Sequence, residues 1–138
     1  TPNTADIVEL GLAAQRGGAD AVVAINTLKA MAIDVETGCP ILGNRFGGLS
    51  GPAIKPVAIR CVYDLKQVLE IPVVGVGGIS SWEDAVEMIM AGASLLQVGT
   101  AVGRGYSIFE EITEGLSAYL ERKSLSLEDL CGMARRRS

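Results

Sequence analysis

Two pairs of small residues follow neighbouring apolar runs in the second half of the sequence. Gly77-Gly78 comes directly after the run 73–76, and Gly99-Thr100 comes directly after the run 95–98. Glycine tolerates positive φ and lets a ligand approach the main chain closely. Backbone N–H groups at the start of a helix can hold a phosphate. If the two runs are adjacent parallel strands, both pairs lie at the ligand-binding edge of the sheet. The pattern therefore predicts one phosphate site formed by both pairs.

Glycine pairs also occur where the chain only needs a tight turn, and a single pair would favour that explanation. Two matched pairs on consecutive runs favour the phosphate site instead. A dinucleotide-binding turn fits less well, because the G-x-G-x-x-G spacing is absent. Gly75 and Gly77 have the spacing of the first two glycines, but the third glycine, Gly78, comes directly after Gly77 instead of three residues later.

Polar residues at the end of an earlier apolar run, 21–26, indicate what else the site binds. The amide of Asn26 offers two donors and an acceptor, which suit a planar imide or amide ring, and Thr27 adds a hydroxyl. A loop-capping role would also explain Asn26. Gly51 stands at a further helix start that we expect on the same rim. Three cations could reach an anion there or remain on the surface: Lys29, Arg45 and Lys55.

The order of elements predicts how these residues are positioned. In the first half we expect a helix from Thr4 to Arg16, a strand over 21–26, a long loop over 27–53 and a helix from Ile54 to Pro72. In the second half we expect a strand over 73–76, a helix begun by a capping box at Ser80 and Glu83, a strand over 95–98, and helices over 108–122 and from Ser126. Alternating strands and helices indicate an α/β protein with a parallel sheet. A phosphate site after strands 7 and 8 is typical of (β/α)8 barrels, so we number the strands six, seven and eight of such a TIM barrel.

Composition narrows the function classes. The sequence has 138 residues, which suits one domain, and its net charge of −4 argues against nucleic-acid binding. It has no apolar run of the roughly 20 residues that a membrane span needs. It contains no histidine, which excludes Ser-His or Cys-His chemistry within the chain. Cys39, Cys61 and Cys131 are scattered, so we expect no metal site and no disulfide framework, and a reducing cytoplasm fits best.

With these motifs, nearly the whole sequence resembles the C-terminal part of the dihydroorotate dehydrogenase family. The stretches "INTL" (25–28), "GGLSGPAIKPVA" (47–58) and "GVGGI" (75–79) carry the resemblance in this order, although "GVGGI" alone would be weak. The wording "GGLSGPAIKPVAIR" is most similar to the catalytic subunits of class 1B, the NAD-linked cytosolic form.

The resemblance implies an FMN-dependent barrel enzyme that oxidises dihydroorotate to orotate in de novo pyrimidine biosynthesis. Residues 1–138 would then be the C-terminal fragment of a single FMN-binding TIM-barrel domain. Electrons would pass to NAD through a partner subunit that carries FAD and an iron–sulfur cluster, and the full-length protein would form a homodimer or heterotetramer. The implied FMN-binding residues are Ile25, Gly51, Gly77, Gly78, Gly99 and Thr100, and the implied substrate-binding residues are Asn26 and Thr27.

The family's catalytic base has no counterpart in this sequence. In class 1 it is a cysteine in the N-terminal half, and none of the three cysteines here matches it. We therefore expect no catalytic residue in this chain and no activity of the chain alone. Three other readings stay open: another FMN-dependent pyrimidine-reducing barrel similar to dihydropyrimidine dehydrogenase, a non-flavin phosphate-binding barrel of histidine or tryptophan biosynthesis, and a non-catalytic phosphate-binding half-barrel.

Overall fold

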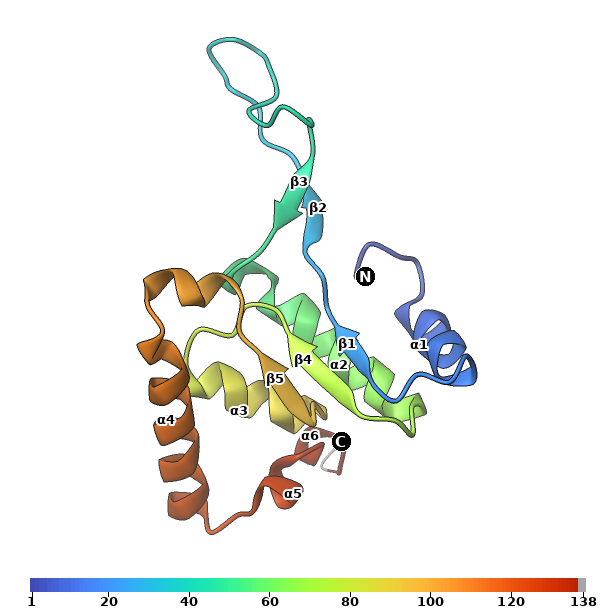
Figure 1. Ribbon diagram of the computed structural model, residues 1–138, viewed down its shortest axis with the longest axis vertical. Coiled ribbons are helices and arrows are strands. Elements are labelled where there is room, and N and C mark those ends of the chain that lie inside the picture. The colour runs from blue at the N-terminus through green and yellow to red at the C-terminus, as the bar shows by residue number, and fades with distance from the viewer. Residues whose placement is uncertain (137–138) are drawn as a thin grey trace.

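A computed structural model describes residues 1–136 of the chain (Figure 1). Its elements are α1 (Ile7–Arg16), β1 (Val22–Ala24), β2 (Leu28–Ala30), β3 (Gly47–Leu49), the 3-10 helix η1 (Pro52–Ile54), α2 (Lys55–Val68), β4 (Val73–Val76), α3 (Trp82–Ala91), β5 (Leu95–Gln97), the 3-10 helix η2 (Thr100–Arg104), α4 (Ser107–Lys123), α5 (Leu127–Leu130) and α6 (Met133–Arg136).

The main sheet has the strand order β1-β4-β5, and both strand pairs are parallel. Helix α2 connects β1 to β4 and α3 connects β4 to β5, so the sheet is built from the predicted βαβ units. The α/β class with a parallel sheet is thereby confirmed. The assignment of these strands to positions six to eight of a barrel stays a prediction.

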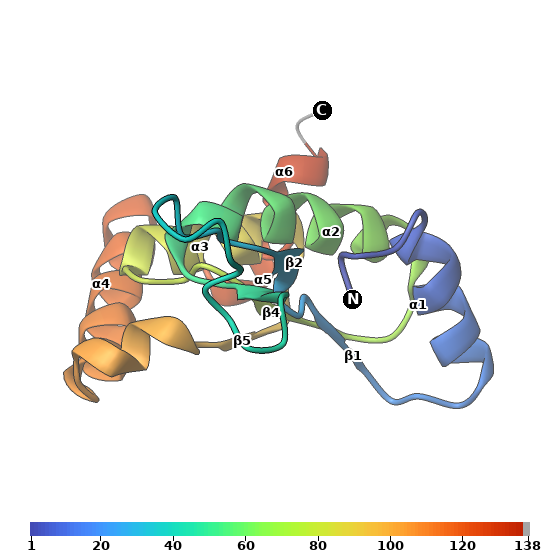
Figure 2. The same cartoon turned by 90° about the horizontal axis from the view of Figure 1, so that it is seen from above.

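Helices α2 and α3 cover one face of this sheet (Figure 2). The core lies between them and the strands, because α2 buries positions at the predicted helical spacing: Ala58, Cys61, Val62 and Leu65. The opposite face is largely bare. Its central residue Val74 is buried, but the flanking Val23 and Leu95 are 57% and 63% exposed. Parallel sheets are normally covered on both faces, so this face is suited to contact further polypeptide.

Two predicted helix starts are displaced. Helix α1 begins after Asp6, whose Oδ1 accepts hydrogen bonds from the N–H groups of Val8 and Glu9 at 2.8 and 3.2 Å, and not at Thr4. The predicted capping box at Ser80 is also wrong. Ser81 caps α3 instead. The N–H and hydroxyl of Ser80 both donate to the carboxylate of Asp84.

The predicted long loop contains an antiparallel hairpin. Strand β2 pairs with β3 from Leu28 opposite Leu49 to Ala30 opposite Gly47, and the segment between them continues outward as a two-stranded ribbon. We call residues 28–49 the arm; it projects away from the helices and the main sheet (Figure 1). The glycines of β3 have low strand propensity, which explains why the sequence pattern did not reveal the pairing.

Candidate functional site

A pocket of about 390 Å³ lies at the carboxyl ends of β1, β4 and β5. This volume falls within the usual range of small-molecule sites, about 300–1,000 Å³. The pocket brings together all eight residues predicted for FMN and substrate. Its lining consists of Ile25, Asn26, Thr27, Ser50, Gly51, Pro52, Ile54, Val76, Gly77, Gly78, Ile79, Ser80, Gly99, Thr100, Ala101 and Arg104. Their individual roles stay predictions.

The first glycine pair is required by the fold itself. Gly77 and Gly78 have φ values of 134° and 77°, which side-chain-bearing residues rarely adopt. A Cβ at Gly78 would lie 2.9 Å from the backbone nitrogen of Lys55, and one at Gly77 would lie 2.8 Å from the Cβ of Ala58. The loop after β4 therefore packs directly on the start of α2. For this pair, close packing and tight turning are sufficient reasons for glycine.

Gly99 is different, because no neighbouring atom would block a side chain there. Its φ is −107°, and a Cβ at this position would meet no atom within 4 Å. The backbone at Gly99 thus borders open space in the pocket lining. The neighbouring Thr100 hydroxyl donates to Ser50 Oγ at 2.9 Å and so links the end of β5 to the end of the arm. A glycine without a packing reason beside a pocket is typical of a close ligand approach.

One of the three predicted anion-binding cations faces α3 instead of the pocket. Lys55 Nζ lies 2.7 Å from Asp84 Oδ1 and 2.6 Å from Glu87 Oε2. The hydrogen bonds that Lys55 donates to Asp84 and Glu87 raise the pKa of Lys55. Burial raises the pKa of Asp84, but hydrogen bonds from Lys55 and Ser80 outweigh it and leave that pKa below its ordinary value. Lys55 therefore joins the start of α2 to α3. Lys29 and Arg45 also lie outside the pocket lining.

Arg104 is the cation that sequence reasoning missed. It lines the pocket and donates from its guanidinium to the carbonyl oxygen of Ser80, so it bridges the segments that follow β5 and β4. Guanidinium groups bind phosphate strongly through paired N–H donors. Its place in "GTAVGRG" (99–105), five residues after Gly99, was the available signal.

The side chain of Asn3 is hydrogen-bonded to the main chain of the predicted substrate-binding segment. Its Nδ2 donates to the carbonyl oxygen of Thr27 at 2.9 Å, and its Oδ1 accepts from the N–H of Lys29 at 2.8 Å. The Oδ1 of Asn26 accepts from the N–H of Thr27 at 2.7 Å. The carbonyl side of the Asn26 amide is therefore partly used within the loop, and its NH2 group has no hydrogen bond within residues 1–136.

Within residues 1–136 the pocket lining includes no cysteine and no acidic side chain. Cys39 is exposed in the arm, Cys131 is partly buried near α6, and Cys61 lies in the core, where burial raises its pKa. Within residues 1–136 no three histidine, cysteine or acidic side chains gather as metal ligands would. In the same range no helix is long and apolar enough to cross a bilayer.

The chain is an α/β protein, because its parallel strands are connected by helices. Its glycine-rich pocket lies at the carboxyl ends of these strands, where α/β barrels and doubly-wound α/β proteins bind their ligands. Comparison with known proteins is more specific. The sequence profile described as dihydroorotate dehydrogenase matches residues 1–120. The chain belongs to the dihydroorotate dehydrogenase family.

Curated relatives share the printed name "Dihydroorotate dehydrogenase B (NAD(+)), catalytic subunit". That of Methanocella arvoryzae is 62% identical over 136 residues, which cover 99% of this chain and 45% of that protein. That of Methanosarcina mazei is 64% identical over 135 residues, covering 97% and 43%. That of Pyrococcus furiosus is 56% identical over 138 residues, covering 99% and 46%. The chain thus spans somewhat less than half the length of these relatives.

Proposed function

We propose that this chain holds FMN by its phosphate at the ends of β4 and β5 and contributes to a site that oxidises dihydroorotate to orotate in pyrimidine biosynthesis. The observation that carries the proposal is Gly99: it lines the pocket, and no atom lies within 4 Å of the place that a Cβ would take there. Membership of the family supports FMN as the ligand.

The residues present fit FMN. The loop glycines and the Thr100 hydroxyl surround the place for the phosphate, and Arg104 supplies a positive charge. Ile25 and Ile54 are 4% and 2% exposed and offer an apolar wall to a flat ring system. FMN, when bound, supplies the acceptor for the hydride that the substrate loses. The chain's own contribution is to bind the cofactor and orient it.

The substrate would lie against the segment that follows β1. The free NH2 group of Asn26 can donate to a ring carbonyl, and the Thr27 hydroxyl can donate or accept beside it. Asn3 fixes the main chain directly after this contact through its bonds to the Thr27 carbonyl oxygen and the Lys29 N–H. This rigid support favours one orientation of a planar pyrimidine ring.

We infer that the catalytic base and the remaining substrate contacts come from polypeptide beyond these 138 residues. Within the described residues no cysteine or acidic side chain lines the pocket, and the relatives are about twice as long. The bare sheet face at Val23 and Leu95 would be covered by further strands of one TIM barrel. Residues 1–138 would form the C-terminal part of that FMN-binding domain. The resemblance to class 1B further implies that electrons reach NAD through a subunit with FAD and an iron–sulfur cluster, in a cytoplasmic enzyme.

A comparison of FMN with riboflavin tests the cofactor assignment, because the two differ only in the phosphate. We expect FMN to bind the chain about tenfold or more tighter than riboflavin, since a hydrogen-bonded phosphate contributes about 1.5–3 kcal/mol. Flavin fluorescence titration measures both affinities. Equal affinities, or no binding of FMN, would contradict the proposed phosphate site.

A second assay tests the missing base. Dihydroorotate added to the FMN-loaded chain should not bleach the visible absorbance of the flavin, because no group in the pocket can take the ring proton. The full-length subunit should bleach it. Bleaching by the 138-residue chain alone would show that the catalytic base lies within it.

A further inference from the structure

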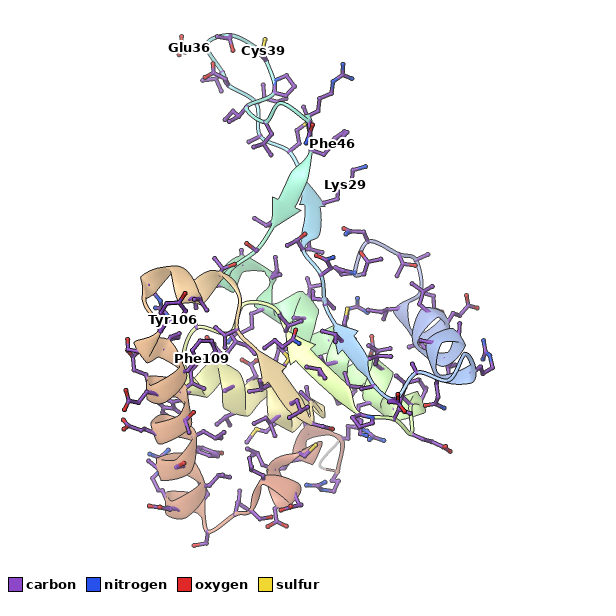
Figure 3. The ribbon with its side chains drawn as sticks, viewed as in Figure 1. Lys29, Glu36, Cys39, Phe46, Tyr106 and Phe109 are labelled. Carbon is purple, nitrogen blue, oxygen red and sulfur yellow. The ribbon has the colours of Figure 1, made fainter. Side chains whose placement is uncertain are left out.

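Arg104 depends on one hydrogen bond for its position at the pocket. Its guanidinium donates to the carbonyl oxygen of Ser80, and within residues 1–136 it forms no other hydrogen bond and no ion pair. The segment that follows gives it little support, because Tyr106 is 81% exposed. Figure 3 shows Tyr106 and Phe109 at the junction of η2 and α4, on the periphery of the molecule. The direction of the guanidinium therefore follows the position of Ser80.

Ser80 is held in turn by the carboxylate of Asp84. The Oδ2 of Asp84 accepts from both the N–H and the hydroxyl of Ser80, each at 2.8 Å. Its Oδ1 accepts from Lys55 Nζ at 2.7 Å. The side chain of Asp84 is only 13% exposed, and hydrogen bonds are stronger where little water surrounds them. One carboxylate oxygen thus binds α2 and the other binds the loop after β4.

These contacts form a continuous chain from α3 to the rim of the pocket. Lys55 fixes the carboxylate of Asp84, the carboxylate fixes both donors of Ser80, and the carbonyl oxygen of Ser80 accepts from Arg104. Every link includes a charged group, and hydrogen bonds of this kind are about twice as strong as neutral ones. Asp84 itself lies outside the pocket lining. It can therefore act on a ligand only through the residues that it holds.

We propose that Asp84 is a positioning residue for the phosphate: it holds Ser80 so that Arg104 directs its guanidinium toward the end of β5. The inference rests on the proposed function, because the phosphate of FMN is the group that Arg104 would bind. It goes further in giving a residue of α3, outside the pocket, a part in the preference for a phosphorylated flavin. Residues that support a binding group in this way affect affinity without touching the ligand.

Glu87 provides a matched control for Asp84. Its Oε2 lies 2.6 Å from the same Lys55 Nζ, and among residues 1–136 its carboxylate pairs with Lys55 alone. The variants Asp84→Asn and Glu87→Gln each replace one carboxylate on Lys55 by an amide of the same shape. Only the first of them changes the group that holds Ser80.

The quantity to measure is the ratio of the riboflavin Kd to the FMN Kd, obtained by flavin fluorescence titration of the chain. A variant that only loosens the pocket weakens both flavins and leaves this ratio unchanged, whereas a misplaced Arg104 weakens FMN alone. Asp84→Asn should lower the ratio about fivefold, and Glu87→Gln should lower it less than about twofold.

A double-mutant cycle tests whether Asp84 acts through Arg104. In the Arg104→Gln background, Asp84→Asn should change the ratio less than about twofold, because the guanidinium that it positions is absent. An effect independent of Arg104 would be the same in both backgrounds. Ser80→Ala removes one of the two hydrogen bonds that Asp84 accepts from Ser80 and keeps the pair with Lys55. It should lower the ratio about threefold.

The outcomes distinguish this inference from the proposed function. A lowered ratio for Asp84→Asn, little change for Glu87→Gln and loss of the effect in the Arg104→Gln background support it. If Asp84→Asn keeps the ratio of the unchanged chain, if both amide variants lower it equally, or if the effects of Asp84→Asn and Arg104→Gln add, the inference is wrong and the phosphate site stands. If the unchanged chain does not prefer FMN, the proposed function fails and the inference fails with it. If Asp84→Asn loses the circular dichroism spectrum of the folded chain, Ser80→Ala decides: a lowered ratio supports the inference and an unchanged ratio overturns it.

Discussion

Two glycine-to-alanine substitutions separate glycines that the fold requires from a glycine that the ligand requires. Gly78→Ala and Gly99→Ala add the same methyl group to the same pocket rim. Their surroundings differ: Gly78 has positive φ and packs on the backbone of Lys55, whereas Gly99 has negative φ and open space. Each substitution is therefore the control for the other.

The expected magnitudes follow from these surroundings. At Gly78, a left-handed conformation and the overlap with backbone 2.9 Å away should together lower the free energy of unfolding. The sum of the two effects is roughly 2–4 kcal/mol. Gly99→Ala should lower the free energy of unfolding less than Gly78→Ala does, because no neighbour must move. The same methyl group would keep a phosphate from the backbone, so FMN affinity should fall at least about tenfold, the equivalent of one lost charge-assisted hydrogen bond.

Urea unfolding followed by circular dichroism gives the stability, and fluorescence titration with FMN and riboflavin gives the affinities. For Gly99→Ala we expect a midpoint above that of Gly78→Ala, weaker FMN binding and unchanged riboflavin binding. If Gly99→Ala binds FMN as tightly as the unchanged chain, the backbone at this position does not contact the phosphate. If it unfolds as easily as Gly78→Ala, the reasoning from open space is wrong.

Three further predictions concern charge and packing. Arg104→Gln should weaken FMN binding about tenfold while riboflavin binding is unchanged, with Arg104→Lys intermediate; fluorescence titration measures both. Because the pKa of Asp84 is lowered in the folded chain, its contribution to stability is present above its ordinary value of 3.8 and is lost as pH falls through the lower folded value. Asp84→Asn should therefore flatten the acid side of a plot of unfolding free energy against pH, and an unchanged acid side would contradict the Lys55–Asp84 contact. Gly115→Ala places a Cβ 2.3 Å from the ring of Trp82, so α4 must move from α3 and urea unfolding should show a loss of about 1–3 kcal/mol.

Local patterns in the sequence were sufficient for the elements of the main sheet. The run 73–76 is apolar throughout, as expected of a central parallel strand, and β4 has these bounds with Val73, Val74 and Gly75 buried. The spacing of Ala58, Cys61, Val62 and Leu65 revealed the buried side of α2. The arm escaped this reasoning, because Gly47 and Gly48 have little strand propensity and their pairing with β2 depends on contacts distant in sequence.

The residue types alone determined that this chain has glycine-rich strand ends, an asparagine-threonine pair after one strand and no histidine to act as a base. Only the tertiary structure decided which cation serves the pocket. The sequence made Lys55 a candidate for binding an anion, but two carboxylates of α3 pair with it. Arg104 is the cation that lines the pocket. It also distinguished Gly99 from Gly77 and Gly78. The physical reason is that a side chain's neighbours, and the space it would fill, are set by packing between distant segments, which no local pattern records.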